Sequence, residues 1–235
     1  MNEKNPSKNI LITGASRGLG LALARALAAR GWQLLIDARG KSGLTAAAAE
    51  LAQQTTVIAL AGDITDPEHR IALAQAARQL GGLDAVVNNA GILGPSPQPA
   101  LHNYPLDTLQ AVFETNVLAP LAILQTLRGQ LRPGARVINI SSDAAVSAYE
   151  GWGGYGASKA ALEQATAVYA VENPEQRVYW VDPGDMNTAM HQAAFPGEDI
   201  SDRPEPSAAV PGLLALLEQE LPGGRYQAQQ MPDFA

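Results

Sequence analysis

The sequence lacks several features that mark particular classes of protein. It has no cysteine and only three histidines among 235 residues, so a disulfide-stabilised scaffold is excluded and no clustered ligand spacing points to a metal site. Its 16 Lys and Arg against 23 Asp and Glu give a net charge of −7. Because no basic stripe follows the chain, nucleic acid is not an expected partner.

Long hydrophobic runs are also missing. Residues 1–8 are polar, and the first apolar run, residues 10–12, is far too short for a signal peptide. The longest uncharged stretch, residues 85–106, is interrupted by Pro, Gly and Asn, which excludes a membrane-spanning helix. We therefore expect no membrane association and a cytoplasmic location.

Short apolar runs alternate with longer helical segments along the chain. The runs show little alternation of polar and apolar positions, as is typical of a parallel sheet covered on both faces. We predict strands at 9–13, 33–37, 57–60, 83–88, 136–141, 178–182 and 225–229, and helices at 18–30, 44–53, 67–80, 106–127, 155–171 and 208–220. Right-handed crossovers then give a single α/β domain over residues 1–235, a doubly wound parallel sheet (Rossmann-like) with helices on both faces.

A glycine-rich loop lies between the first predicted strand and the first predicted helix. It reads Thr13-Gly14-Ala15-Ser16-Arg17-Gly18-Leu19-Gly20. Glycines permit a tight turn and let backbone N–H groups approach a pyrophosphate, so the loop indicates a dinucleotide site. A plain strand-to-helix turn is the alternative interpretation.

The spacing Gly-x-x-x-Gly-x-Gly resembles that of the short-chain dehydrogenase/reductase family, classical type. Further motifs follow in the family's order: Asn88-Asn89-Ala90-Gly91, Asn116, Ser141-Ser142, Tyr155-Gly156-Ala157-Ser158-Lys159 and Pro183-Gly184-Asp185-Met186-Asn187-Thr188. The resemblance covers most of the chain. It implies an oxidoreductase that uses a pyridine nucleotide on a doubly wound sheet.

Tyr155 and Lys159 are four residues apart at the start of a predicted helix, so one turn places both side chains on the same face. A free phenol has a pKa of about 10, and a neighbouring cation lowers it, which makes Tyr155 a candidate general acid and base. The alternative is a surface Tyr/Lys pair without a chemical role. The resemblance implies that Ser142 hydrogen-bonds the substrate oxygen and that Lys159 binds the nicotinamide ribose. It also implies that Asn116 holds a water, although an Asn bonded within its own helix region is the alternative.

The resemblance further implies a set of nucleotide-binding residues: Gly14, Ser16, Arg17, Gly18, Leu19, Gly20, Arg39, Asp63, Ile64, Asn89, Ala90, Gly91, Tyr155, Lys159, Pro183, Gly184, Met186 and Thr188. Asp37 lies near the offset at which an acid binds the 2′-hydroxyl of NAD. The register places the family's acid at Ala38 instead, and Arg39 falls where an arginine binds a 2′-phosphate, with Arg17 as a second cation. We therefore expect NADP (NADPH) rather than NAD, with Asp37 facing another group.

The predicted substrate pocket is largely apolar or aromatic. Its candidate residues flank the predicted catalytic groups: Asp143, Ala144, Tyr149, Trp152, Met186, Met190, His191 and Phe195. They suit a hydrophobic or aromatic ketone or aldehyde better than a phosphorylated sugar, and simple packing under a lid is the alternative. Residues 189–207 are polar, contain several prolines and are expected to form that lid. We interpret His191 as a loop residue.

Two functions remain open on the sequence. The first is an NADP-dependent carbonyl reductase or alcohol dehydrogenase, and the second is a non-catalytic NADP-binding sensor or scaffold. Asn116, Ser142, Tyr155 and Lys159 are all present, which favours the enzyme. Small residues on the helix after Tyr155 would admit a partner helix, so we expect a homodimer or a tetramer: Ala157, Ala160, Ala161 and Ala165.

Overall fold

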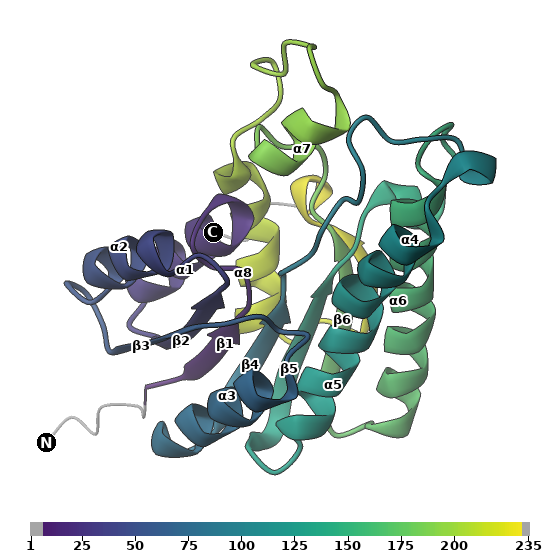
Figure 1. Ribbon diagram of the computed structural model, residues 1–235. Helices are drawn as coiled ribbons and strands as arrows, with labels where there is room; N and C mark the ends of the chain where they lie inside the picture. Colours follow the sequence, from purple (N-terminus) through teal and green to yellow (C-terminus); the bar gives the residue numbers. More distant parts are fainter. Residues whose placement is uncertain (1–6, 232–235) are drawn as a thin grey trace, which may run out of the picture.

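Residues 7–231, which the computed structural model describes, build a seven-stranded sheet in which every strand pair is parallel. The strand order is β3-β2-β1-β4-β5-β6-β7 (Figure 1). The strands are β1 Asn9–Ile12, β2 Gln33–Ala38, β3 Val57–Ala61, β4 Leu83–Asn88, β5 Leu131–Ile140, β6 Arg177–Asp182 and β7 Gly224–Gln227. The predicted doubly wound parallel sheet is confirmed.

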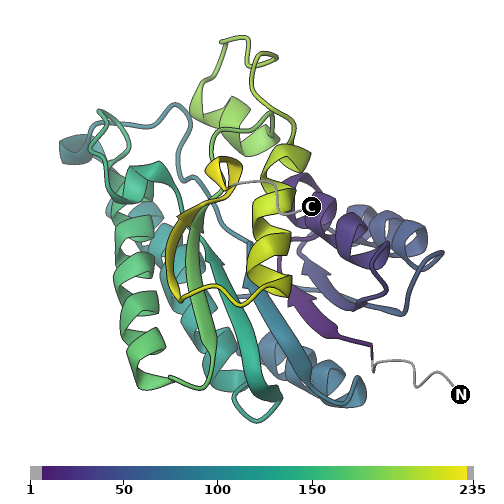
Figure 2. The same cartoon turned by 180° about the vertical axis from the view of Figure 1, so that it is seen from behind.

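Helices cover both faces of this sheet, as the two opposite views show (Figures 1 and 2). One face carries α1 Gly18–Ala28, α2 Lys41–Leu51 and α8 Val210–Glu218. The other carries α3 Pro67–Gln79, α4 Leu106–Phe113, α5 Ala119–Thr126 and α6 Gly153–Glu172. The short α7, Ala189–Ala194, lies beyond the sheet, and 3-10 turns occur at Leu101–Asn103, Asp143–Ala145, Pro206–Ala209 and Ala228–Gln230.

The strands are buried on both faces because successive side chains point to opposite sides of a sheet. In β1, Ile10 and Ile12 pack into the core beneath α1 and α8, whereas Leu11 packs into the core beneath α3 and α5. All three side chains are fully buried. This explains why the strands appear in the sequence as continuous apolar runs.

Three elements differ from the sequence prediction. The helix expected at 106–127 is interrupted by a π-helical turn, Glu114–Leu118, between α4 and α5. The fifth strand begins five residues earlier than predicted, because Leu131 pairs with Leu83 and the register then shifts before Arg136. The segment expected to be an irregular excursion begins with α7, whose first turn is capped by the Thr188 hydroxyl. Among helices within residues 7–231, none combines the length and apolar character that a bilayer crossing requires.

Candidate active site

A cavity of about 1020 Å³ lies at the carboxyl edge of the sheet. The strand order reverses between the neighbouring strands β1 and β4. The chain leaves these two strands toward opposite sides of the sheet, and the cavity opens between them. Ligands of open α/β sheets bind at such a switch point. The volume is at the upper end of the range for ligand pockets, as a long dinucleotide requires.

The glycine loop forms one wall of this cavity because its backbone packs closely on the loop after β4. Gly14 has a φ of +67°, and a Cβ there would lie 2.9 Å from the Ala90 Cα. The Asn89 side chain donates from Nδ2 to the carbonyls of Thr13 (2.8 Å) and Gly14 (3.2 Å). The loop therefore ends at the N-terminus of α1 with its backbone held in place, an arrangement that attracts phosphate groups.

Asp37 supports the same loop from below. Its Oδ1 accepts a hydrogen bond from the Gly14 N–H (2.9 Å), and its Oδ2 lies 3.0 Å from His69 Nε2 on α3. Both side chains are buried. Burial raises the pKa of the Asp37 carboxyl, while the bonds to His69 and Gly14 partly offset that rise. The expectation that Asp37 faces another group at the strand end is confirmed.

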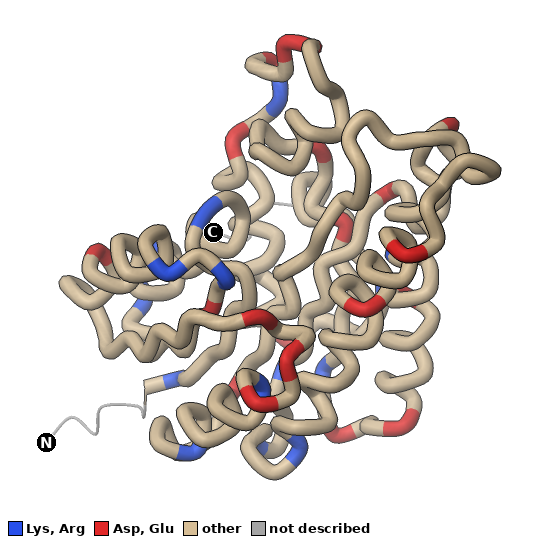
Figure 3. Tube along the Cα trace, viewed as in Figure 1, with Lys and Arg blue, Asp and Glu red and all other residues tan. Residues whose placement is uncertain are grey.

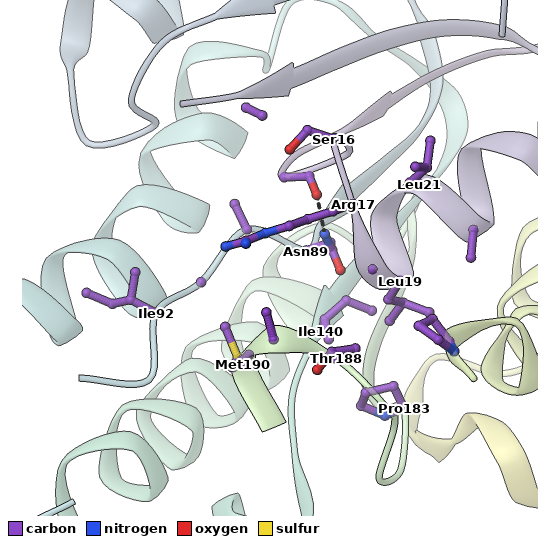
Figure 4. A pocket seen from close by; sticks show the side chains of 18 of the residues that line it. Ser16, Arg17, Leu19, Leu21, Asn89, Ile92, Ile140, Pro183, Thr188 and Met190 are labelled. Carbon is purple, nitrogen blue, oxygen red and sulfur yellow. Dashed lines mark hydrogen bonds between the residues drawn. The ribbon is translucent and has the colours of Figure 1, made fainter. Parts of the chain in front are cut away.

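Three arginines line the cavity, Arg17, Arg25 and Arg39, and Arg25 is paired with Glu50 on α2. Figure 4 shows the Arg17 side chain extended across the pocket toward the side where Ile92 lies. Arg39 follows β2. Burial acts to raise the pKa of the nearby Asp63, but hydrogen bonds from Thr65, with a smaller contribution from the Arg39 charge, hold it below its usual value. Basic segments lie near one another beside α1 and α2 in Figure 3.

Most residues expected to bind nucleotide do line this cavity. The exceptions are Gly20, where a Cβ would lie 2.6 Å from Asn89 Nδ2, and Gly184, which borders a second, smaller cavity. The structure brings together Gly14, Ser16, Arg17, Gly18, Leu19, Arg39, Asp63, Ile64, Asn89, Ala90, Gly91, Tyr155, Lys159, Pro183, Met186 and Thr188. Sequence reasoning missed Ile92 and Asn187, although each is next to or within a motif that it used.

Tyr155 and Lys159 lie in the first two turns of α6, and both are almost fully buried. The Lys159 Nζ lies 5.5 Å from the centre of the Tyr155 ring and donates to the Ile140 carbonyl at 2.8 Å. Tyr155 lines both cavities, whereas Lys159 lines only the larger. The phenol is therefore placed at the junction between the two.

The proton affinities of this pair differ from the expectation. Burial raises the pKa of the Tyr155 phenol strongly, and the charges of Asp182 and Asp143 raise it further against a hydrogen bond with Ser142. Burial lowers the pKa of Lys159 to about 8, against the charge of Glu163. The expected lowering of the phenol pKa by Lys159 is therefore not found, since desolvation and two carboxylates raise this pKa and the opposing contribution comes from Ser142.

Asn116 lies in the π-helical turn and is fully buried. Its Nδ2 donates to the Ile92 carbonyl (2.9 Å) and to the Ser158 hydroxyl (3.0 Å), and its Oδ1 accepts from the Ile92 N–H (2.9 Å). These partners lie on the loop after β4 and on α6 rather than within the helix that carries Asn116, and the water-holding role stays a prediction. Asn116 also lies near Lys159. Both side chains approach Gly91, where a Cβ would lie 3.2 Å from Asn116 Oδ1 and 3.7 Å from Lys159 Nζ.

The second cavity, of about 100 Å³, lies on the other side of Tyr155. Ser142 borders it, and its hydroxyl donates to Asp143 Oδ1 (2.9 Å) and accepts from the Ala144 N–H (3.2 Å). The other candidates that border it are Asp143, Trp152, Met186, Met190 and His191.

Tyr149 and Phe195 do not line this cavity. Tyr149 is half exposed and donates its hydroxyl to Asp143 Oδ2 (2.8 Å). Phe195 packs on Trp152 with ring centres 5.8 Å apart, so it supports the wall from outside. Asp182 also borders the cavity. It was not predicted from the sequence because it belongs to none of the recognised motifs.

Known proteins share this fold and these motifs. The sequence model of the short chain dehydrogenase family matches residues 8–199. The chain is 32% identical to the short-chain dehydrogenase/reductase FrzI of Cladobotryum sp, over 89% of this chain and 86% of that one. It is 33% identical to the benzil reductase ((S)-benzoin forming) IRC24 of Saccharomyces cerevisiae, over 90% and 82%. A short chain dehydrogenase from Shigella flexneri, solved with NADP, superposes with a TM-score of 0.86 at 30% identity, over 94% and 97%.

The chain therefore belongs to the short-chain dehydrogenase/reductase family and is an oxidoreductase of that family. A pyridine nucleotide fits this site, since the larger cavity combines a glycine-rich loop at a helix N-terminus with the guanidinium groups of Arg17 and Arg39. No cluster of His, Asp and Glu suited to a metal ion occurs within residues 7–231.

Proposed function

We propose that this protein is an NADP(H)-dependent carbonyl reductase or alcohol dehydrogenase that acts on a hydrophobic ketone, aldehyde or secondary alcohol. The observation that carries the proposal is the position of Tyr155, whose side chain lines both the dinucleotide-sized cavity and the small cavity beside Ser142. A group there can exchange a proton with a substrate while a bound nicotinamide supplies or accepts the hydride.

Each polar group around Tyr155 has a role in this proposal. Ser142 and Tyr155 both hydrogen-bond the carbonyl oxygen, and Tyr155 then delivers a proton to it. Lys159 binds the ribose hydroxyls from the larger cavity, and Asn116 supports a proton path from Lys159. The raised pKa of Tyr155 keeps the phenol protonated near neutral pH, which favours its action as an acid in carbonyl reduction.

The preference for NADP rests on how the charges at the end of β2 are used. Asp37 borders the cavity but is only 1% exposed, and each of its carboxylate oxygens already has a partner, Gly14 or His69, so little of it is accessible to a ribose hydroxyl. Arg17 and Arg39 are exposed at the cavity and are suited to a 2′-phosphate. The Shigella flexneri relative that was solved with NADP supports the same assignment.

The preference for a neutral, hydrophobic substrate rests on the lining of the small cavity. Apolar side chains there include Leu93, Trp152 and Met190, and the carboxylates of Asp143, Asp182 and Asp185 also border it. Among described residues, no Lys or Arg lines this cavity, so a phosphate or carboxylate substrate would face carboxylates without a cation in the wall. The yeast relative, named a benzil reductase, agrees with a carbonyl substrate.

Two further features belong to the proposal. Residues 189–207 border the cavities through Met190, Glu205 and Ser207, and we expect them to act as a lid. Hydrogen exchange in this segment that is equally slow with and without ligands would exclude a lid. The exposed Ala157 and Ala160 lie on the outer face of α6, where a second copy would pack, and light scattering distinguishes the monomer from the expected homodimer or tetramer.

The direct test is an assay of NADPH oxidation with a panel of neutral ketones, aldehydes and quinones, together with matched keto acids. Turnover of neutral carbonyls that exceeds turnover of the keto acids supports the proposal. Tight NADPH binding without turnover of any member would instead support a sensor or scaffold.

A further inference from the structure

The last strand places an arginine directly behind the catalytic serine. Arg225 lies in β7, opposite Trp180 of β6, and its side chain is 25% exposed. Its Nε donates to Glu163 Oε1 (3.0 Å) on α6, and its Nη2 donates to the main-chain carbonyl of Ser142 (3.1 Å). One guanidinium thus ties together the edge strand, helix α6 and the loop after β5.

Glu163 extends these contacts to the neighbouring serine. It is four residues after Lys159 and therefore on the same face of α6, and its Oε1 accepts a hydrogen bond from the Ser141 hydroxyl (2.6 Å). Ser141 is thus held by its side chain and Ser142 by its carbonyl. Because the Ser142 hydroxyl is carried by this backbone, the position of the hydroxyl depends on the Arg225 contacts.

Arg225 also lies among the charges that act on the catalytic pair. Its Nη2 is 3.7 Å from Asp182 Oδ2. Beyond the larger effect of burial, Asp182 raises the pKa of Tyr155 and Glu163 raises that of Lys159. Arg225 contacts both carboxylates. The other titratable groups facing Tyr155 and its cavity are Asp143, Lys159, Asp185 and His191.

We infer that Arg225 is a positioning residue of the reaction site, which fixes Ser142 through its carbonyl and balances the charges of Asp182 and Glu163 beside Tyr155 and Lys159. The inference rests on the proposed carbonyl chemistry. Arg225 itself borders neither of the two cavities as described, so it acts through the residues it holds.

The test compares Arg225→Met with Arg225→Lys. Methionine removes both the charge and the fork of donors, so we expect kcat to fall by about tenfold to a hundredfold, as small misplacements of reacting groups do. The pH at which reduction is half lost on the alkaline side should rise by about one unit, since the unbalanced carboxylates of Asp182 and Glu163 disfavour loss of a proton from Tyr155 and from Lys159. Lysine keeps the charge without the fork, so kcat should fall while this pH midpoint stays unchanged. NADPH affinity should stay unchanged in both variants.

Arg136→Met is the matched control. Arg136 on β5 also donates to two carbonyls, those of Leu217 and Gln219, and pairs with Glu220, but at the opposite end of the strands. This variant should lose thermal stability and keep the wild-type pH midpoint. A folded Arg225→Met variant with wild-type kcat and midpoint would overturn the inference. If that variant does not fold, an unchanged kcat in Arg225→Lys overturns it, and a lowered kcat at an unchanged midpoint supports it.

Failure of the proposed function would look different. In that case the wild type reduces no carbonyl, and the ionisation of Tyr155 is followed instead by ultraviolet titration in the NADP complex, as the difference between each protein and its Tyr155→Phe derivative. Onset at higher pH in Arg225→Met than in the wild type still supports the role of Arg225. Coincident titrations reject it.

Discussion

Two aspartates near opposite edges of the sheet occupy similar positions but have different partners. Asp37 is the second-last residue of β2 and Asp182 is the last residue of β6, and both are at least 96% buried. Each accepts a hydrogen bond from the N–H of a left-handed glycine in the adjoining loop, Asp37 from Gly14 and Asp182 from Gly184, both at 2.9 Å. The fold thus uses the same device on the nucleotide side and on the reaction side.

The difference lies in the group that faces each carboxylate. Asp37 meets the imidazole of His69, whereas Asp182 lies beside the guanidinium of Arg225. On the nucleotide side the carboxylate holds a loop. On the reaction side its charge reaches Tyr155 and contributes to the raised phenol pKa. A buried carboxylate in this fold can therefore serve as a support or as an electrostatic influence, depending on its partner.

The largest effect should come from the reaction side. Tyr155→Phe deletes the proposed proton donor and keeps the ring that packs against Trp152, with ring centres 5.9 Å apart, so turnover should fall by about 10²- to 10⁴-fold. NADPH affinity should be retained, since the ring still lines the cavity. Steady-state kinetics and fluorescence titration with NADPH measure the two quantities. Turnover within a few-fold of wild type would remove Tyr155 as the acid.

A substitution on the nucleotide side should have the opposite pattern, with stability and NADPH affinity reduced and kcat retained. His69→Leu leaves Asp37 buried without its partner, a loss of about 3 to 5 kcal/mol in the free energy of unfolding. NADPH should bind more weakly because the Gly14 loop loses its support, while kcat at saturating NADPH stays near wild type. Denaturant unfolding and binding titrations test this, with the exposed His102→Leu as control. Wild-type stability in His69→Leu would show that Asp37 needs no partner.

The sequence predicts the nucleotide side better than the reaction side, for a physical reason. The strands, the glycine loop and the Tyr155/Lys159 pair are local patterns, because each depends on residues within one or two turns of chain. Arg225 meets Glu163 across 62 residues and Ser142 across 83, so no local spacing records these contacts. The early start of β5 is not evident from the sequence for a similar reason. Pro133 and Gly134 indicate a loop, but Leu131 already pairs with Leu83, and the strand continues from there across a register shift.

A smaller effect concerns cofactor selectivity, which we propose depends on Arg39 rather than on the Asp37 carboxylate. If Arg39 binds the 2′-phosphate, each of its charge-assisted hydrogen bonds contributes about 1.5 to 3 kcal/mol. Arg39→Leu should therefore reduce the preference for NADPH over NADH by at least about tenfold, and Ala38→Asp combined with Arg39→Leu should invert it. The ratio of kcat/KM values is the measurement. If the wild-type enzyme uses NADH as well as NADPH, Asp37 is instead the group that binds the ribose hydroxyl.

The smallest expected effect is the uptake of a fraction of a proton when nucleotide binds. It involves Lys159, which lies between the nucleotide side and the reaction side. Burial lowers the pKa of this amine to about 8, so at that pH about half of the side chains are uncharged. Ribose hydroxyls and nearby phosphates favour the charged amine, which raises its pKa in the complex. Nucleotide binding near pH 8 should therefore take up as much as about half a proton, and affinity should decline as the pH rises through this range, because a ligand that requires protonation binds less tightly when protons are scarce. Calorimetry in two buffers with different ionisation enthalpies measures the uptake. Tyr155→Phe should retain it and Lys159→Met should lose it; equal uptake in wild type and Lys159→Met would assign the proton to another group.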